Sequence, residues 1–122
     1  MDPSFFPLPL GASKVIQGGV MVAVVAGGLA QSAADASGVR VMGVSTQTVD
    51  NTGGAASAKS VEVRMGDFWF KNSGSAPCTT ASIGDDIYVE DDTTVAISGT
   101  LVAGRCIGFH PVDGRVRVRV GF

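Results

Sequence analysis

The residues able to do acid–base or metal chemistry are few, and the first of them is a single histidine. His110 stands immediately before Pro111 at the start of an expected turn. An imidazole works as a general base or a metal ligand only beside a nucleophile, a carboxylate or further ligands. No such partner lies at a recognisable spacing from His110. We therefore interpret His110 as a surface turn residue.

A cluster of carboxylates offers a second possibility, a cation site. Calcium binds about six to eight oxygen ligands. The acids flank an expected strand at two separate turns, and their spacing lacks the glycine and the terminal glutamate of an EF-hand loop. We favour the interpretation without a metal and keep a calcium site as the alternative. The acids are Asp85, Asp86, Glu90, Asp91 and Asp92.

Motifs of covalent and nucleotide chemistry are missing from the sequence. No serine occupies a Gly-x-Ser-x-Gly elbow, and the glycine pairs at 18–19, 27–28 and 53–54 lack dinucleotide spacing. Cys78 and Cys106 have no identifiable histidine partner, and without an export signal we expect two free, buried or half-buried thiols. The sequence therefore predicts no enzyme and no cofactor.

The end of the chain has the clearest periodicity. Residues 115–120 alternate arginine with valine, which places three arginines on one face of a strand and three valines on the other. Charges on such a face commonly only solvate it or deter edge-to-edge pairing. The alternative is that Arg115, Arg117 and Arg119 meet the acidic region at 85–92, within the subunit or across an interface. The three arginines are therefore candidate contact residues.

The run Phe68-Trp69-Phe70 is more aromatic than one strand face needs. In a strand, Trp69 must point opposite to its two neighbours. Either both faces of this strand are covered, or Trp69 anchors an interface, a role that tryptophan often fills. Trp69 joins the candidate contact residues.

The elements that must position these residues are short strands. Apolar runs recur down the chain, each closed by Gly, Asp, Asn or Ser, and glycine supplies 17 of 122 residues. This pattern predicts an all-β fold, a small barrel or sandwich of about nine short strands. We expect a hairpin across Asp91-Asp92, a turn at 111–114, a bulge or hairpin corner at Gly66-Asp67 and no helix at 32–38. The expected strands cover 13–17, 20–25, 39–44, 61–65, 68–70, 87–89, 94–97, 105–109 and 115–120.

The first ten residues differ from the rest because they contain three prolines. Prolines hold the chain extended and remove backbone donors. We expect residues 1–10 to form an extended Pro/Phe-rich arm and residues 11–122 a single β-domain. Such an arm spans roughly 30 Å at about 3.3 Å per residue, enough to reach a neighbouring molecule. The alternatives are a flexible terminus or an arm folded back on its own core. Its candidate anchors are Phe5, Phe6, Leu8 and Leu10.

Charge and hydropathy exclude two classes of partner. A net charge of −2 offers duplex DNA no broad basic face, so we expect no nucleic-acid partner. The longest apolar stretch, 20–30, is interrupted by Gly27-Gly28, whereas a spanning helix needs about 20 apolar residues. We therefore expect no membrane segment. Asp2 and the nearby prolines do not fit the pattern of a signal peptide. We therefore expect synthesis and folding in the cytoplasm.

The order of several short motifs resembles a known family. The most specific is Ile83-Gly84-Asp85-Asp86-Ile87-Tyr88-Val89. The chain from about Gly11 to Phe122 is similar to the small all-β head decoration, or capsid cement, proteins of tailed bacteriophages. The Pro/Phe arm departs from that pattern. The other matching motifs are Gly18-Gly19-Val20-Met21-Val22, Gly43-Val44, Val61-Glu62-Val63 with Gly66, Cys106-Ile107-Gly108 and Val116-Arg117-Val118.

The resemblance implies a structural virion protein that binds the outer surface of an assembled phage capsid and stabilises it against internal DNA pressure. Its partners would be the major capsid protein and its own copies, often as a homotrimer at local three-fold positions, after synthesis in the host cytoplasm. The alternative is a tail or baseplate β-module that binds carbohydrate or another virion protein. The candidate capsid or subunit contacts are Phe5, Phe6, Leu8, Leu10, Trp69, Arg115, Arg117 and Arg119.

Overall fold

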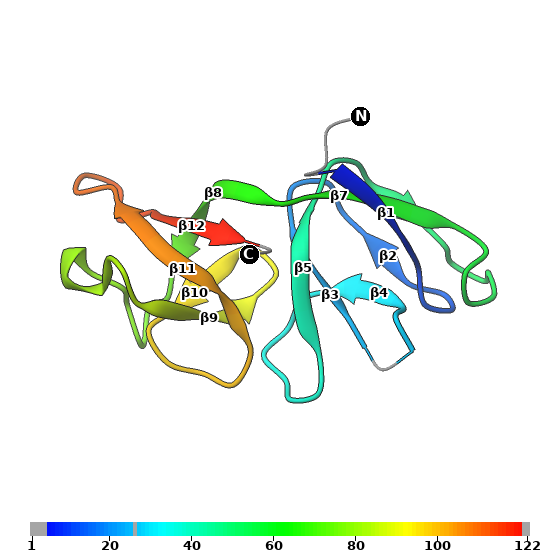
Figure 1. Cartoon of the computed structure of the whole chain (residues 1–122), viewed down its shortest axis with the longest axis horizontal. Coiled ribbons are helices and arrows are strands. Elements are labelled where there is room, and N and C mark those ends of the chain that lie inside the picture. Colours follow the sequence, from blue (N-terminus) through cyan, green and yellow to red (C-terminus); the bar gives the residue numbers. More distant parts are fainter. Residues whose placement is uncertain (1–4, 26, 121–122) are drawn as a thin grey trace.

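The computed structural model describes residues 5–25 and 27–120 and confirms the predicted all-β fold (Figure 1). Within those two stretches no helix has the length and apolar character needed to cross a bilayer. The strands are β1 (Phe5–Pro9), β2 (Val15–Ile16), β3 (Met21–Val24), β4 (Ala30–Ser32), β5 (Arg40–Ser45), β6 (Val49–Asp50), β7 (Ser60–Arg64), β8 (Gly66–Asn72), β9 (Asp86–Asp91), β10 (Thr94–Ala96), β11 (Val102–Phe109) and β12 (Val116–Val120), with a 3-10 helix η1 (Thr80–Ser82) before β9.

The strands form two regions that lie side by side in Figure 1. We call the first the N-terminal sheet (5–64); its strand order is β1-β7-β5-β3-β4, with a small ribbon of β2 and β6. We call the second the C-terminal barrel (66–120), which closes in the order β10-β8-β12-β11-β9. The expected hairpin of β9 and β10 and the turn between β11 and β12 are both confirmed. The segment 32–38 contains no helix, as expected.

The first strand belongs to the N-terminal sheet. β1 pairs antiparallel with β7, from Phe5 opposite Arg64 to Pro9 opposite Ser60. Phe6 and Leu8 pack against a core in which Leu10 is fully buried. Residues 5–10 are therefore extended as predicted, but they lie on their own sheet and do not reach away from it. This is the folded-back alternative that the sequence left open.

Alternation explains how a strand with prolines fits at this edge. The amide of Leu10 donates to the carbonyl of Lys59 at 2.9 Å. Residues two apart point the same way in a strand, so the nitrogens of Pro7 and Pro9 face away from β7. The pairing with β7 therefore needs no donor from either proline, and proline is tolerated at such an edge.

The N-terminal sheet curls around a core of its own. A parallel bridge joins Leu10 to Ala30, and the amide of Gly11 donates to the carbonyl of Ala30 at 3.1 Å. The two outer strands of the sheet therefore meet through a single bridge. The core comprises Leu10, Ile16, Val20, Val22, Ala30, Val61 and Val63.

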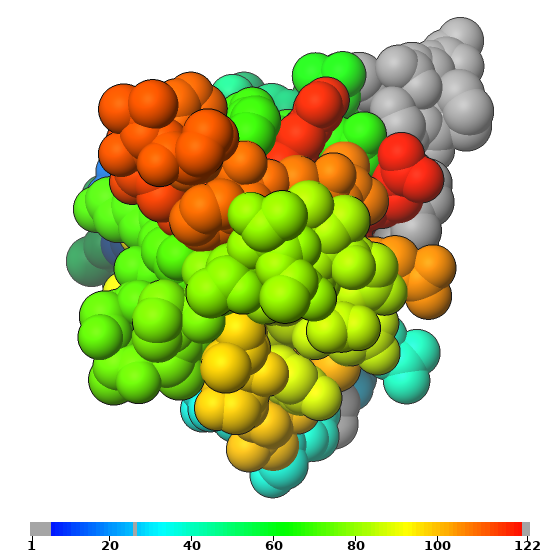
Figure 2. Space-filling view, turned by 90° about the vertical axis from the view of Figure 1, so that its left-hand side faces the viewer, coloured from blue at the N-terminus to red at the C-terminus, as the bar shows by residue number. Residues whose placement is uncertain are grey.

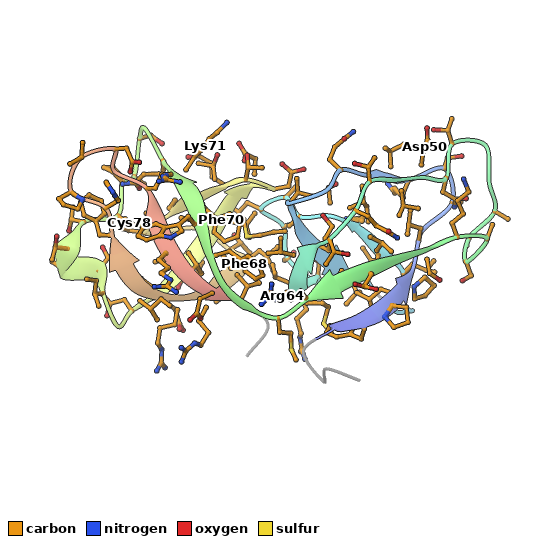
Figure 3. The ribbon with its side chains drawn as sticks, turned by 90° about the horizontal axis from the view of Figure 1, so that it is seen from above. Asp50, Arg64, Phe68, Phe70, Lys71 and Cys78 are labelled. Carbon is orange, nitrogen blue, oxygen red and sulfur yellow. The ribbon has the colours of Figure 1, made fainter. Side chains whose placement is uncertain are left out.

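The chain passes from the sheet to the barrel in one extended run. β7 ends at Arg64 and β8 begins at Gly66, and Figure 3 shows this run crossing from one region to the other. β7 pairs with β5 and β1, whereas β8 pairs with β12 and β10. The expected bulge or hairpin corner at Gly66-Asp67 is instead the point where one run changes sheets.

The barrel core continues into the sheet. Val116, Val118 and Val120 are fully buried, so the valine face of residues 115–120 points inward as predicted. Met21 and Val44 of the sheet belong to the same core cluster as these valines. Backbone contacts also join the regions, since the amide of Met21 donates to the carbonyl of Asp92 at 2.8 Å. One face of the N-terminal sheet thus supports the barrel.

Candidate functional site

The outer wall of the barrel gathers the charged and aromatic residues of β8 and β12. In the antiparallel ladder Trp69 lies opposite Arg117, and Asp67 lies opposite Arg119. Because Phe70 and the valines of β12 fill the interior, the alternate residues must face outward. We call this surface the Trp–Arg face; it comprises Asp67, Trp69, His110, Asp113, Arg115, Arg117 and Arg119.

Trp69 is exposed but held in place. Its side chain retains 42% exposure, although the residue sits in the middle of β8. The guanidinium carbons of Arg115 and Arg117 lie 5.6 and 6.0 Å from the ring centre, within the range of cation–π attraction. The His110 ring meets the indole edge to face, with centroids 6.0 Å apart. The indole is therefore preorganised at the surface, which lowers the entropy lost when it binds a partner.

Arg119 makes the strongest ion pair of the face. Its Nε lies 2.9 Å from Oδ1 of Asp67, and its Nη2 lies 3.3 Å from Oδ2, a bidentate arrangement. This hydrogen bonding holds the pKa of Asp67 below its usual range and raises that of Arg119. Both groups are therefore charged at neutral pH, and Asp67 is committed to Arg119.

Asp113 orders the turn beside Trp69. It accepts hydrogen bonds from the backbone amide of Arg115 at 3.0 Å and from its Nε at 2.8 Å. The hydrogen bond from the backbone amide of Arg115 is the main reason why the pKa of Asp113 is lowered. Nδ1 of His110 accepts from the amides of Val112 and Asp113 at 3.3 and 3.4 Å. Oδ1 of Asp113 also lies 3.2 Å from this nitrogen.

Arg117 is the arginine of this face with donors to spare. Its nearest carboxylate oxygen, Oδ2 of Asp67, is 4.0 Å away, and that carboxylate already binds Arg119. The side chain of Arg117 is 48% exposed. It also lies beside a hollow in the wall that is lined by Arg64, Gly66, Asp67, Arg117 and Arg119. An approaching carboxylate could therefore bind Arg117 next to the indole of Trp69.

The eight residues predicted as contacts divide into two groups. Trp69, Arg115, Arg117 and Arg119 come together on the Trp–Arg face. Leu10 is fully buried, so it is not a surface anchor in this structure. Phe6 and Leu8 pack against the same core but remain half-exposed, so their predicted contact with a neighbour stays a prediction. Phe5 lies in β1, but its side chain is outside the described part of the chain.

Sequence reasoning missed Asp67 and Asp113 and gave His110 no partner. Alternation alone puts Asp67 on the same face as Trp69, so this residue could have been found. Its pairing with Arg119 depends on the register between β8 and β12, which residues 52 apart in the chain do not reveal. His110 does lie at a turn as predicted, yet its contact with Trp69 depends on the pairing of β11 with β12 as well as that of β12 with β8.

The acidic region is separate from these ion pairs. Within the subunit the arginines bind Asp67 and Asp113, so the predicted alternative of a contact with 85–92 is not made inside one chain. Glu90 accepts from the hydroxyl of Ser73, and Asp91 accepts from the amide of Thr93 at 2.9 Å. Among residues 5–25 and 27–120, no group of three or more acids, histidines and cysteines could hold a metal ion.

The two cysteines are free and buried, as predicted. Burial raises the pKa of Cys78 to about 11 and also raises that of Cys106. A thiol with a raised pKa carries little thiolate at neutral pH, so both are poor nucleophiles in the folded chain. They therefore belong to the barrel core and add no chemistry to the face.

No family model, no curated protein and no solved structure matches this chain.

Proposed function

We propose that this chain is a structural virion protein that binds the outer surface of an assembled phage capsid and stabilises it, with the Trp–Arg face as its assembly surface. The observation that carries the proposal is an exposed Trp69 in contact with two guanidinium groups on the wall of a closed barrel. Tryptophan and arginine are, with tyrosine, the residues enriched among the hot spots of protein interfaces.

The scaffold beneath the face suits a bracing role. Each strand of the barrel has two neighbours, so the backbone under Trp69 and the arginines is bonded on both sides. Ion pairs to Asp67 and Asp113 fix Arg119 and Arg115 before any partner arrives. A rigid, prearranged surface loses little entropy on binding. The proposal takes the major capsid protein as partner, the capsid exterior as location and a homotrimer as the assembled form.

Co-sedimentation with capsids tests the proposal. The capsids are assembled from the major capsid protein encoded in the same genome and are mixed with the full chain or with Trp69→Ala. We expect the full chain to sediment with the capsids and to raise their melting temperature. Loss of the indole should weaken binding at least about tenfold, since this needs only about 1.4 kcal/mol.

Val15→Ala is the matched control, because Val15 is exposed to a similar extent, 40%, but lies in β2 of the N-terminal sheet. This variant should bind like the full chain. A full chain that never sediments with capsids would overturn the proposal. If the chain instead binds glycans on an array and Trp69→Ala abolishes that binding, the carbohydrate-binding alternative replaces it.

A further inference from the structure

We propose that the Trp–Arg face of one copy binds an acidic patch on a second copy. We define the acidic patch as Ile83 and Asp85 from the segment between η1 and β9, Asp86 at the start of β9, and Ile97 directly after β10. The inference rests on the proposed function and deepens it: the Trp–Arg face joins copies within the homotrimer, and the homotrimer binds the capsid, so capsid binding weakens when the copies separate. It adds which surface the second copy presents.

The first support is an excess of positive charge around the Trp–Arg face. Arg105 on β11 lies directly opposite Arg119 on β12, and like charges at such positions destabilise a sheet. Both arginines, with Asp86, line a hollow next to the face. In the described part of the chain Arg105 makes no ion pair, and Arg117 has only the distant carboxylate of Asp67. The repulsion between Arg105 and Arg119 within one subunit is offset when a neighbouring copy supplies carboxylates.

The second support is that the chain itself carries unpaired carboxylates. Asp85 and Asp86 are both exposed, and neither forms an ion pair or a side-chain hydrogen bond with any described residue. Asp86 lies directly opposite Arg105 in the ladder between β9 and β11, yet the two side chains make no ion pair. Both acids are therefore available to a second copy. Complementary charge of this kind sets the register and the rate of association.

The third support is the apolar surface beside these acids. Ile97 is 49% exposed and lines the same hollow as Asp85 and Asp86, and Ile83 is 47% exposed two residues before Asp85. Figure 2 shows the yellow-green chain around residues 80–90 and the golden loop that follows residue 97 next to each other on one end of the molecule. Exposed isoleucines beside unpaired acids complement an exposed tryptophan beside Arg117, whose one carboxylate contact is 4.0 Å long.

Sedimentation velocity of the full chain over a range of concentrations tests this pairing. We expect the full chain to self-associate, and more weakly as salt is raised, because surface charges are screened within about 10 Å at 0.1 M salt. Arg117→Glu should weaken association at least about tenfold, as should the double change Asp85→Arg and Asp86→Arg, because each places like charges against each other. An equimolar mixture of the two variants should restore association.

Arg40→Glu is the control, since Arg40 is an exposed arginine on β5, in the N-terminal sheet. It should associate like the unchanged chain. A chain that stays monomeric at every concentration, either variant associating normally, or a mixture that stays monomeric would overturn the inference.

The capsid experiment separates this inference from the proposed function. A chain that is monomeric in solution but sediments with capsids through Trp69 would overturn only the pairing of copies. A chain that self-associates as expected but never binds capsids would overturn only the proposed function.

Discussion

The N-terminal sheet and the C-terminal barrel are both curled β-sheets, but they close in different ways. In the barrel every strand has a bonded neighbour on each side. In the sheet, the described residues join the end of β1 to β4 by one isolated bridge, from Leu10 to Ala30. Closure by full ladders lets the barrel carry an ordered, exposed site, whereas closure by one bridge makes the sheet dependent on its first strand.

The two regions also treat their large apolar residues differently. The sheet places Phe6, Leu8 and Leu10 against its core, while the barrel leaves Trp69 at the surface in contact with arginines. Stability should therefore respond to changes at β1, and assembly to changes on the Trp–Arg face. Variants in each region can test this division.

The largest effect is expected at the bridge of the N-terminal sheet. Leu10→Ala removes a fully buried side chain and leaves a cavity, which should lower the free energy of unfolding by about 2 to 5 kcal/mol in a denaturant titration. Leu8→Ala, at a half-buried position on the same strand, should cost less. Equal, small effects of both changes would show that β1 contributes little to the sheet.

The next effect is expected in the barrel. A methyl group at Gly104 would overlap the backbone carbonyl oxygen of Arg119, which belongs to the neighbouring strand β12. Gly104→Ala should therefore force the ladder apart and cost about 1 to 3 kcal/mol of stability. At Gly108 the nearest atom is Cβ of Arg117 at 3.4 Å, so Gly108→Ala should be nearly neutral. Similar melting temperatures for the two variants would contradict this packing of β11 on β12.

How far the sequence predicts each region follows from the same difference. The alternation in residues 115–120 identified both the buried valines and the outward arginines, because a strand's period is independent of its neighbours. The prolines of β1 favoured the prediction of an arm. That β1 pairs with β7 without needing an amide donor from either proline can be recognised only once the register of the two strands is known. The ion pair of Asp67 with Arg119 could not be predicted either, because it depends on the register between β8 and β12.

A smaller effect is expected where the two regions touch. Oδ1 of Asp35, in the loop after β4, accepts hydrogen bonds from the amides of Thr100 and Leu101, both at 2.8 Å. Asp35→Ala removes these bonds between the sheet and the barrel and should cost about 1 kcal/mol. Asp35→Asn keeps the accepting oxygen, so its melting temperature should lie between those of Asp35→Ala and the unchanged chain. If Asp35→Ala melts like the unchanged chain, the loop does not hold the regions together.

The smallest effect is a dependence on pH at the same junction. Burial raises the pKa of Asp92, and the charge of Asp91 adds to this. A raised pKa means that ionising Asp92 costs the folded state more free energy than the unfolded state. The free energy of unfolding therefore falls as pH rises from the ordinary pKa of an aspartate through the raised one. Asp92→Asn should be slightly more stable than the unchanged chain at pH 7, by up to about 0.5 kcal/mol, and indistinguishable from it below about pH 3. A stability difference that is the same at both pH values would contradict this assignment.

The most direct test of the central claim uses Trp69, the only tryptophan in the chain. Replacing it with 5-hydroxytryptophan allows its emission to be excited apart from that of tryptophans in the capsid. The free chain should be quenched readily by acrylamide, as expected for a side chain with 42% exposure. In chains bound to capsids, quenching should fall and the emission should shift to the blue, because the Trp–Arg face is covered. Bound chains that are quenched as readily as free ones would contradict the claim that this face is the assembly surface.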